Sequence, residues 1–317
     1  MGRTRWGNLP VPPDPFHRSV SRTSAPRRRR AAPHWIWGLA YATPAVALVG
    51  IFVGYPFGSI VYHAFTRWDG IAPAQWVGLH NFRVLWNDPL FLRSLRNNAL
   101  FAISVPVQMV LPLLVAYVIH RRVPGWRLFR ATVFLPAVYA TVVIGIICYT
   151  VFQLDGALNS ALGGVGLGSL RHEWLANAST SIPLILLVVI WTNFGYNVLL
   201  YLAGMSAIDP SLEEAARIDG AGWLRVLRHV VVPDLRRVME IVLVVNTITA
   251  FAFMFTYIFT ITNGGPGYDT YVSEFYIYNQ AFTNQNMGYA AAIGVMLVLI
   301  VLAIGLLQIR ALTRKEA

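Results

Sequence analysis

The segment from Asp209 to Arg237, DPSLEEAARIDGAGWLRVLRHVVVPDLRR, combines carboxylates, small residues and a glycine at spacings that suit contact with a partner. Ser211 and Glu214 have the spacing of a capping box, in which each side chain satisfies a free backbone N–H at the start of a helix. The alanines that follow are small, good helix formers, and they leave a smooth surface that a partner can approach closely. The chemistry expected here is therefore docking through polar and close-packed contacts.

Other residues that could support catalysis or nucleotide binding do not form a complete motif. The chain has one lysine, Lys315, near its C-terminus. A P-loop requires a lysine directly after its glycines, so we expect no ATP site of that type. The glycines between residues 163 and 168 follow no strand and predict a flexible external turn. His172-Glu173 lacks the second histidine of a zinc protease, and Ser206 lacks the closing glycine of a nucleophile elbow. We expect no enzyme activity, no metal and no cofactor on this chain.

The elements that must position these residues are membrane-spanning helices. The 317 residues are 56% hydrophobic and 12% charged, whereas a soluble domain carries about 25% charge. Several apolar runs reach bilayer-spanning length, roughly 20 residues, and they do not alternate as the strands of a barrel would. The predicted spans are 36–63, 99–119, 132–153, 182–205, 238–262 and 288–309.

The positions of the basic residues predict the orientation of these spans. If the N-terminus is cytoplasmic, 20 of the 25 lysines and arginines lie in inside segments. Because positive residues favour the inside, both termini and the 209–237 loop are expected in the cytoplasm. The same distribution explains the net charge of +11 without nucleic acid.

The predicted fold class is an all-α integral membrane protein with six transmembrane helices and a cytoplasmic loop that carries a coupling helix. Residues 1–35 are rich in proline and arginine and predict a disordered basic tail. Residues 36–310 form the predicted membrane domain, and 311–317 a short cytoplasmic tail.

Within the 209–237 loop the pattern predicts two short helices. The first is expected to begin near Leu212, and Gly220 suits its left-handed C-terminal residue. The second is expected over 222–231, ending before Pro233. Its apolar residues fall at helical spacing and are expected to pack on the membrane domain: Trp223, Leu224, Leu227 and Val231. The pattern alone leaves open a simpler interpretation, an amphipathic hairpin at the membrane surface with no partner.

The loop is similar to a known family signature. Glu-Ala-Ala, three residues, a glycine, nine residues and an aliphatic-x-aliphatic-proline string resemble the EAA loop of permease subunits in binding-protein-dependent ABC importers. The Asp-Gly-Ala string resembles the sugar-uptake branch. The residues assigned to ATPase coupling are Glu213, Glu214, Ala215, Ala216, Asp219, Gly220, Ala221 and Pro233. Strings at 97–98, 129–136, 261–282 and 288–292 are similar to the same branch.

The resemblance also implies partners. In that family the loop helix sits in a cleft of a cytoplasmic ATPase subunit, so Glu214 would make polar contacts there and the two alanines would pack closely. The implied assembly contains a second, related permease in a heterodimer, two ATPase subunits, an extracytoplasmic solute-binding protein and membrane lipid. The expected location is the bacterial plasma (inner) membrane, with several spans and both termini in the cytoplasm.

Two further sets of residues are expected to contact the solute or its carrier. The binding protein would dock on the 66–97 and 263–287 loops, and nearby tyrosines could equally form an aromatic belt. The predicted docking residues are Gly264, Gly265, Pro266, Asp269 and Glu274. Polar residues of the spans could line a solute path or join helices to one another. They are Gln108, Asn193, Tyr196, Asn197, Asn246, Thr249 and Tyr257.

The resulting prediction is the permease subunit of an ATP-driven importer for a carbohydrate or polyol-like solute. Alternatives are an ABC permease for a peptide, amino acid or phosphodiester, a stand-alone secondary transporter, and a membrane enzyme. A secondary transporter usually has carboxylates within its spans or an inverted repeat. Here the acidic residues lie in loops or near helix ends, which disfavours that alternative.

Overall fold

The computed structural model describes Gly2 and residues 34–121 and 126–313. The chain divides into two compact units, Met1–Gly54 and Tyr55–Ala317. In the first unit α1 (His34–Val49) contains Pro44 and is followed by a π turn, η1 (Gly50–Gly54). Most of the predicted tail at 1–35 lies outside the described residues, as do residues 314–317 of the predicted C-terminal tail.

In its described residues the second unit is helical apart from one short hairpin. It begins with α2 (Tyr55–His63), β1 (Thr66–Arg67), β2 (Gln75–Trp76), α3 (His80–Trp86), α4 (Pro89–Ala102) and α5 (Val105–His120). The strands are antiparallel, and Thr66 lies opposite Trp76. It continues with α6 (Trp126–Val138), α7 (Thr141–Phe152), α8 (Ala157–Gly164), a 3-10 turn η2 (Gly168–Leu170) and α9 (Ala178–Met205).

The remaining elements of this unit form the 209–237 loop and the last spans. They are α10 (Pro210–Ile218), α11 (Trp223–Val226), η3 (Leu227–Val231), α12 (Val232–Asp234), α13 (Arg236–Ala252), α14 (Phe255–Ile261), α15 (Ser273–Tyr278), η4 (Asn279–Thr283) and α16 (Met287–Thr313). The elements η3 and η4 are π turns.

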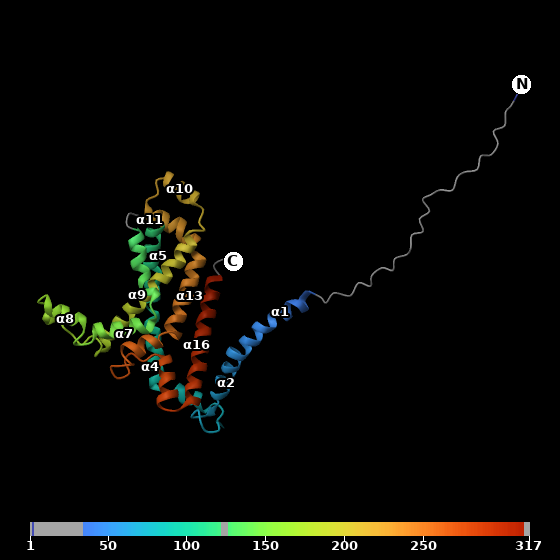
Figure 1. The fold of residues 1–317 in the computed structure, drawn as a ribbon, viewed down its shortest axis with the longest axis vertical. Coiled ribbons are helices and arrows are strands. Elements are labelled where there is room, and N and C mark those ends of the chain that lie inside the picture. The colour runs from blue at the N-terminus through green and yellow to red at the C-terminus, as the bar shows by residue number, and fades with distance from the viewer. Residues whose placement is uncertain (1, 3–33, 122–125, 314–317) are drawn as a thin grey trace. The chain divides into compact units, whose positions relative to one another are not determined.

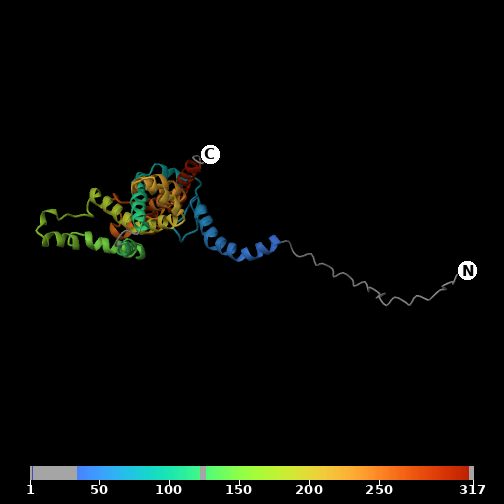
Figure 2. The same cartoon turned by 90° about the horizontal axis from the view of Figure 1, so that it is seen from above.

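Helices α5, α9, α13 and α16 run along the same bundle (Figure 1) and are grouped together when seen from above (Figure 2). Helix α13 contacts the other three. Two hydrophobic clusters fill the bundle. One includes Phe101, Ile185 and Ile258, and the other includes Tyr201 and Leu235. The second cluster also holds residues of the 209–237 loop, so this loop is packed onto the bundle.

The predicted helical membrane fold is confirmed. Among the described residues, five helical runs are long and apolar enough to cross a membrane, and α13 with α14, bent by 49°, makes a sixth if that pair is one span. The five runs are Tyr41–His63, Pro89–His120, Thr141–Gly164, Ala178–Met205 and Met287–Leu312. Large apolar side chains such as Leu302 and Leu307 are exposed on α16. Such surfaces are unfavourable in water and suit lipid or a partner helix.

Two predicted spans are wrong in detail. The predicted span 132–153 is interrupted, because α6 ends at Val138 and Ala140 has extended backbone (φ −62°, ψ 137°). The predicted span 238–262 breaks at Phe253 and Met254, between α13 and α14. Both breaks lie in apolar sequence. Hydropathy indicates that a segment prefers the membrane to water, but it does not show where the helix is interrupted. A break inside a membrane requires side chains that satisfy the freed backbone groups.

Candidate functional site

The start of α10 differs from the predicted capping box. Asp209, not Ser211, is the N-cap residue, and its carboxylate accepts from the Ser211 N–H at 2.9 Å. Pro210 occupies the first turn, where a missing N–H has no cost, so the helix begins two residues earlier than Leu212. The hydrogen bond from the Ser211 backbone holds the pKa of the Asp209 carboxyl below its ordinary value. Glu214 is thereby freed from any capping role.

The end of α10 is the turn predicted at Gly220. Gly220 has φ +74°, its N–H donates to the Arg217 carbonyl at 3.0 Å, and the Ala221 N–H donates to the Ala216 carbonyl at 2.9 Å. This pair of bonds is the Schellman pattern that closes helices with a left-handed glycine. The turn directs the chain back toward the bundle at Trp223.

The second predicted helix does not stop before Pro233. The chain forms α11, widens into the π turn η3 and continues through Pro233 in α12. A π turn shifts the backbone hydrogen bonds by one residue, and such turns accompany local disruption of an α-helix. Leu227 and Val231 are buried as predicted. Trp223 and Leu224, however, are 55% and 57% exposed, so the prediction that they pack on the membrane domain is wrong.

The two adjacent glutamates of α10 point to different surroundings. Glu213 is buried, and its carboxylate accepts from Arg217 at 3.1 Å and lies 3.5 Å from Nε2 of His120 at the end of α5. Glu214 is exposed. A second contact joins the same elements, because the Tyr117 hydroxyl of α5 donates to the Trp223 carbonyl at 3.4 Å. The loop is therefore attached to α5 through Glu213, while Glu214 is available to a partner.

The outer surface of α10 combines charge with apolar groups. Glu214, Ala215 and Asp219 are exposed, and Ile218 is 86% exposed. Ala216 and Ala221 instead pack partly against the hydrophobic cluster of the bundle. Ala215 and Ala216 therefore lie on different sides of the helix. Pro233 is exposed on the segment that follows. Sequence reasoning did not find His120 and Tyr117, because nothing in α5 marks its contact with a loop 90 residues away.

Several of the predicted solute-path residues join helices. Asn197 and Asn246 exchange hydrogen bonds of 3.2 and 3.3 Å between α9 and α13, and Asn197 also donates to the Gln108 carbonyl at 3.1 Å. The Tyr257 hydroxyl lies 2.7 Å from that of Thr192. Gln108, Asn197, Asn246 and Tyr257 are all buried within this chain. The side chains of Asn197, Asn246 and Tyr257 therefore make interhelical contacts, the alternative that the sequence left open. The Gln108 side chain instead donates to the Ser104 hydroxyl at the start of its own helix, at 2.8 Å.

The other three path candidates remain accessible. Tyr196 is 48% exposed on α9. Asn193 and Thr249 are partly exposed, and each also bonds a backbone carbonyl one turn earlier, at 2.9 Å. In the part of the chain that the structure describes, no group of three histidine, cysteine or acidic side chains could hold a metal ion.

At the opposite end of the bundle, the predicted docking segment is held tightly to α4. Asp269 pairs with Arg93, and the Asn97 amide donates to the carbonyls of Asp269 and Tyr271 at 2.7 and 2.8 Å. Gly264 has φ +85°, and a side chain there would collide with the ring of Tyr271. Gly264 therefore fixes the fold of this segment rather than offering a contact surface. Gly265 and Pro266 are partly exposed.

Glu274 is only partly exposed, and its carboxylate is bonded within the fold. Its carboxylate accepts from the Asn98 amide at 3.0 Å and from the Met254 N–H at 3.0 Å, and the Asn98 amide also donates to the Ala250 carbonyl at 2.9 Å. Burial raises the pKa of Glu274 to about 7, although these hydrogen bonds act in the opposite direction. Glu274 and Asn98 together satisfy backbone groups on both sides of the break between α13 and α14. Glu274 thus has a structural role within this chain, and its assignment to docking stays a prediction.

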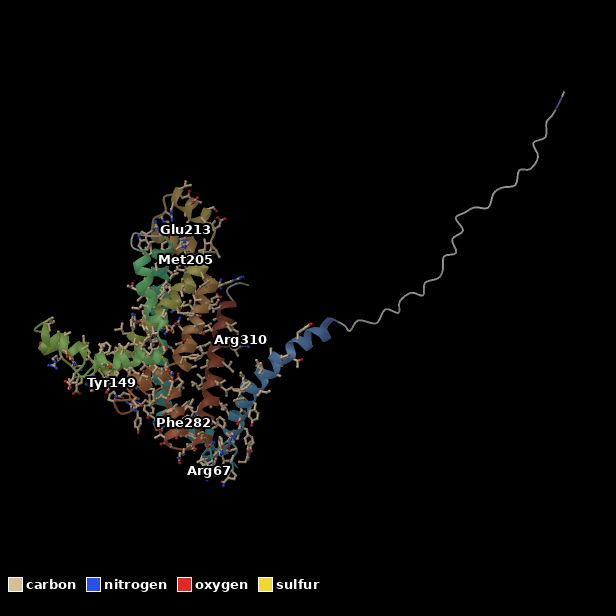
Figure 3. All side chains as sticks on the ribbon, viewed as in Figure 1. Arg67, Tyr149, Met205, Glu213, Phe282 and Arg310 are labelled. Carbon is tan, nitrogen blue, oxygen red and sulfur yellow. The ribbon has the colours of Figure 1, made fainter. Side chains whose placement is uncertain are left out.

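The two functional ends lie far apart in the bundle. Figure 3 shows Glu213 and Met205 at one end, and Arg67 and Phe282 at the other. A bundle of membrane-length helices with an anchored loop helix at one end and a structured polar segment at the other indicates a multi-pass membrane protein.

Comparison with known proteins identifies the family. Residues 90–315 match the family described as the binding-protein-dependent transport system inner membrane component. The chain is 34% identical over 275 residues to the probable ABC transporter permease protein YurN of Bacillus subtilis (strain 168), covering 85% of this chain and 94% of YurN. It is 33% identical over 287 residues to the lactose transport system permease protein LacF of Rhizobium radiobacter, covering 88% and 95%.

A solved structure shares the fold. It is a crystal structure of a bacterial ABC transporter involved in the import of the acidic polysaccharide alginate, with a TM-score of 0.78 and 24% identity over 88% of this chain and 96% of that chain. The present chain belongs to the family of inner membrane permease subunits of binding-protein-dependent transport systems. The resemblance inferred from the EAA loop is confirmed, and the chain is a transport subunit of a family whose permeases are generally non-catalytic.

Proposed function

We propose that ATPase subunits on separate chains bind the outer surface of α10, and that this end of the bundle faces the cytoplasm. The supporting observation is the opposite placement of Glu213 and Glu214. A helix held to the membrane domain by one carboxylate, and exposing its neighbour beside Ala215 and Ile218, can receive a partner and pass its movement to α5. Ile218, 86% exposed, gives this surface an apolar contact group beside its charged ones.

The complete assembly in this proposal has four kinds of protein chain. The permease pairs with a second, related permease as a heterodimer, two ATPase subunits bind on the cytoplasmic side, and a solute-binding protein delivers cargo on the other side. Closure of the ATPase pair would pull the two α10 helices together and change the access of the solute path. Such coupling requires the nucleotide to favour one of the two states. The chain itself carries no cofactor and lies in a bacterial plasma membrane.

The proposed cargo is a carbohydrate or polyol-like solute. Its support is the lactose transport function in the name of LacF, which aligns with 88% of this chain, together with the Asp219-Gly220-Ala221 string in the loop. Within the spans, Asn193, Tyr196 and Thr249 keep accessible polar groups that suit hydroxyl-rich solutes. These three replace the longer set of path residues expected from the sequence.

Reconstitution tests the proposal. The permease pair, the ATPase subunits and the solute-binding protein are assembled in proteoliposomes, and uptake of carbohydrates that bind the binding protein is measured with and without ATP at the α10 side. We expect uptake only when ATP and binding protein are both present. Uptake at full rate without ATPase subunits would instead identify a secondary transporter. ATP-driven uptake of an amino acid or peptide, with no carbohydrate transported, would overturn the cargo alone.

A further inference from the structure

A polar cavity of about 500 Å³ lies at the end of the bundle opposite α10. Its lining comes from β1, α3, the start of α4, and the chain from η4 to the first turn of α16, and Arg67 is the lining residue that Figure 3 labels. We call this cavity the rim pocket. None of the residues assigned above to coupling or to the solute path lines it, so neither of those roles accounts for it.

The floor of the rim pocket is a carboxylate whose hydrogen bonds are already made. One oxygen of Asp88 accepts from the hydroxyls of Tyr276 and Tyr289, each at 2.5 Å. The other accepts from the N–H groups of Leu90 and Phe91 at 2.9 and 3.4 Å. Burial acts to raise the pKa of Asp88, but these bonds outweigh it and hold the pKa below its ordinary value. The charge of Asp88 is therefore used within the fold.

The walls of the pocket are fixed relative to one another. The Asn81 amide of α3 donates to the carbonyls of Ala64 and Thr66, both at 2.9 Å. The N–H of Gly288 at the start of α16 donates to the Trp68 carbonyl at 3.0 Å, and a side chain at Gly288 would collide with Thr66. These contacts join the hairpin, α3 and α16. A binding site is effective when such a supporting shell is formed before the ligand arrives.

The upper lining of the pocket carries polar groups that the fold does not use. Arg67, His80, Asn284 and Gln285 are exposed lining residues, and the structure gives their side chains no hydrogen-bond or ionic partner among the described residues. Gln285 has φ +52°, a conformation that costs energy for a residue other than glycine. The backbone bonds on either side of it, at 2.9 and 2.8 Å, hold it there.

The available groups select the chemistry of the ligand. Arg67 is a permanent cation with five N–H donors, whereas the ionised carboxylate of Asp88 already accepts four hydrogen bonds from the fold. The unused groups on the other wall are amides, which donate and accept hydrogen bonds. A carboxylate fits this combination, because arginine binds carboxylates through paired donors. A sugar ring fits less well, since Tyr276 and Tyr289 are only 4% and 6% exposed and offer no free ring face.

We propose that the rim pocket receives an acidic side chain of the solute-binding protein, with Arg67 as its main contact. This inference rests on the proposed function, in which that protein docks at the end opposite α10. The pocket is formed mainly by the 66–97 and 263–287 loops predicted for docking, but it contains none of the five docking residues named from the sequence. A socket of this kind would set the orientation of the binding protein over the permease.

The test uses the complete transporter in nanodiscs and the solute-loaded binding protein that stimulates the wild-type ATPase. Binding is measured by titration for Arg67→Ala, Arg67→Glu and Asn284→Ala. Arg171→Glu is the matched control, since Arg171 is also exposed, lies on the same predicted side and does not line the pocket. Co-elution of the ATPase subunits with each variant shows that the permease is folded and assembled.

We expect Arg67→Ala to weaken binding ~10-fold, Arg67→Glu to weaken it further, and Arg171→Glu to leave it within about twofold of wild type. Added salt should reduce the difference between wild type and Arg67→Ala, as for a charge pair. Wild-type affinity in Arg67→Glu would overturn the proposal, as would equal losses in Arg67→Glu and Arg171→Glu. If the wild-type complex hydrolyses ATP but no binding protein stimulates it, the proposed function fails as well.

Discussion

Replacing Glu213 by glutamine should separate attachment of the α10 helix from recognition of its partner. The Glu213 side chain is 10% exposed and contacts Arg217 and His120, which are 50% and 32% exposed. A hydrogen bond to a charged group contributes about 1.5–3 kcal/mol, and the exposure of Arg217 places the value near the lower limit. Loss of about 1.4 kcal/mol shifts the equilibrium between attached and detached α10 about tenfold.

The assay compares ATP hydrolysis and solute uptake in the same proteoliposomes. We expect Glu213→Gln to keep its ATPase subunits during purification but to transport up to about tenfold less solute per ATP. His120→Gln should have an effect in the same direction, and the double variant should be no worse than the stronger single one, because the two side chains share one contact. Glu214→Gln is the matched control, and it should weaken association with the ATPase subunits.

Two results would refute this reasoning. Glu213→Gln could retain the wild-type ratio of transport to hydrolysis, which would show that the contact with α5 carries no movement. Alternatively, Glu213→Gln could lose the ATPase subunits as readily as Glu214→Gln, which would show that the two glutamates do not have different roles.

Three further predictions concern the turn at Gly220 and the break between α13 and α14. Gly220→Ala should destabilise the end of α10 by about 1–2 kcal/mol, because φ is +74° there and alanine rarely adopts a left-handed backbone. A Cβ at this position would contact no other atom, so the effect comes from the backbone alone. Gly222→Ala is the control, and equal ATPase affinity in both variants would contradict the argument. Asn98→Ala should lower the free energy of unfolding by about 3 kcal/mol through loss of its bonds to Ala250, Ser273 and Glu274. Asn87 is exposed, so Asn87→Ala should change the free energy of unfolding little. Similar melting temperatures for the two variants would be inconsistent with this role of Asn98. The folded-state pKa of Glu274, about 7, exceeds its ordinary value of 4.5, so folding favours the neutral form, and stability should fall by about 3 kcal/mol as pH rises from 4.5 to 7. Glu274→Gln should lose that part of the pH dependence of thermal unfolding, and an unchanged pH profile would exclude Glu274 as its source.

The features predicted well from the sequence are those with local causes. The presence of membrane-spanning helices follows from the apolar runs, although their breaks do not, and the left-handed Gly220 follows from the residue that ends α10. The EAA loop was found because its pattern lies within one continuous segment. By contrast, Asp209 and Pro210 together compete with Ser211 for the helix start, and the Ser211–Glu214 spacing alone does not show which start prevails.

The features that were missed depend on contacts between distant segments. Glu274 lies 20 residues after the break that it stabilises, and Asn98 lies more than 150 residues before it. The roles of Asn197 and Asn246 depend on which faces of α9 and α13 meet, and one sequence does not specify those faces. The same limitation hid the contact between His120 and Glu213. Such residues can be recognised as polar and unusual from the sequence, but their partners cannot.

The most direct test of the account is the accessibility of α10 with and without the ATPase subunits. The only cysteine is Cys148, which is buried, so in a Cys148→Ala background single cysteines can replace Ala215, Ile218 or Asn284. A membrane-impermeant maleimide is added to either side of oriented vesicles. We predict labelling of positions 215 and 218 only from the cytoplasmic side, protection of both when the ATPase subunits bind, and labelling of position 284 only from the other side. Equal labelling of positions 215 and 218 with and without ATPase subunits would contradict the proposal that force enters through α10.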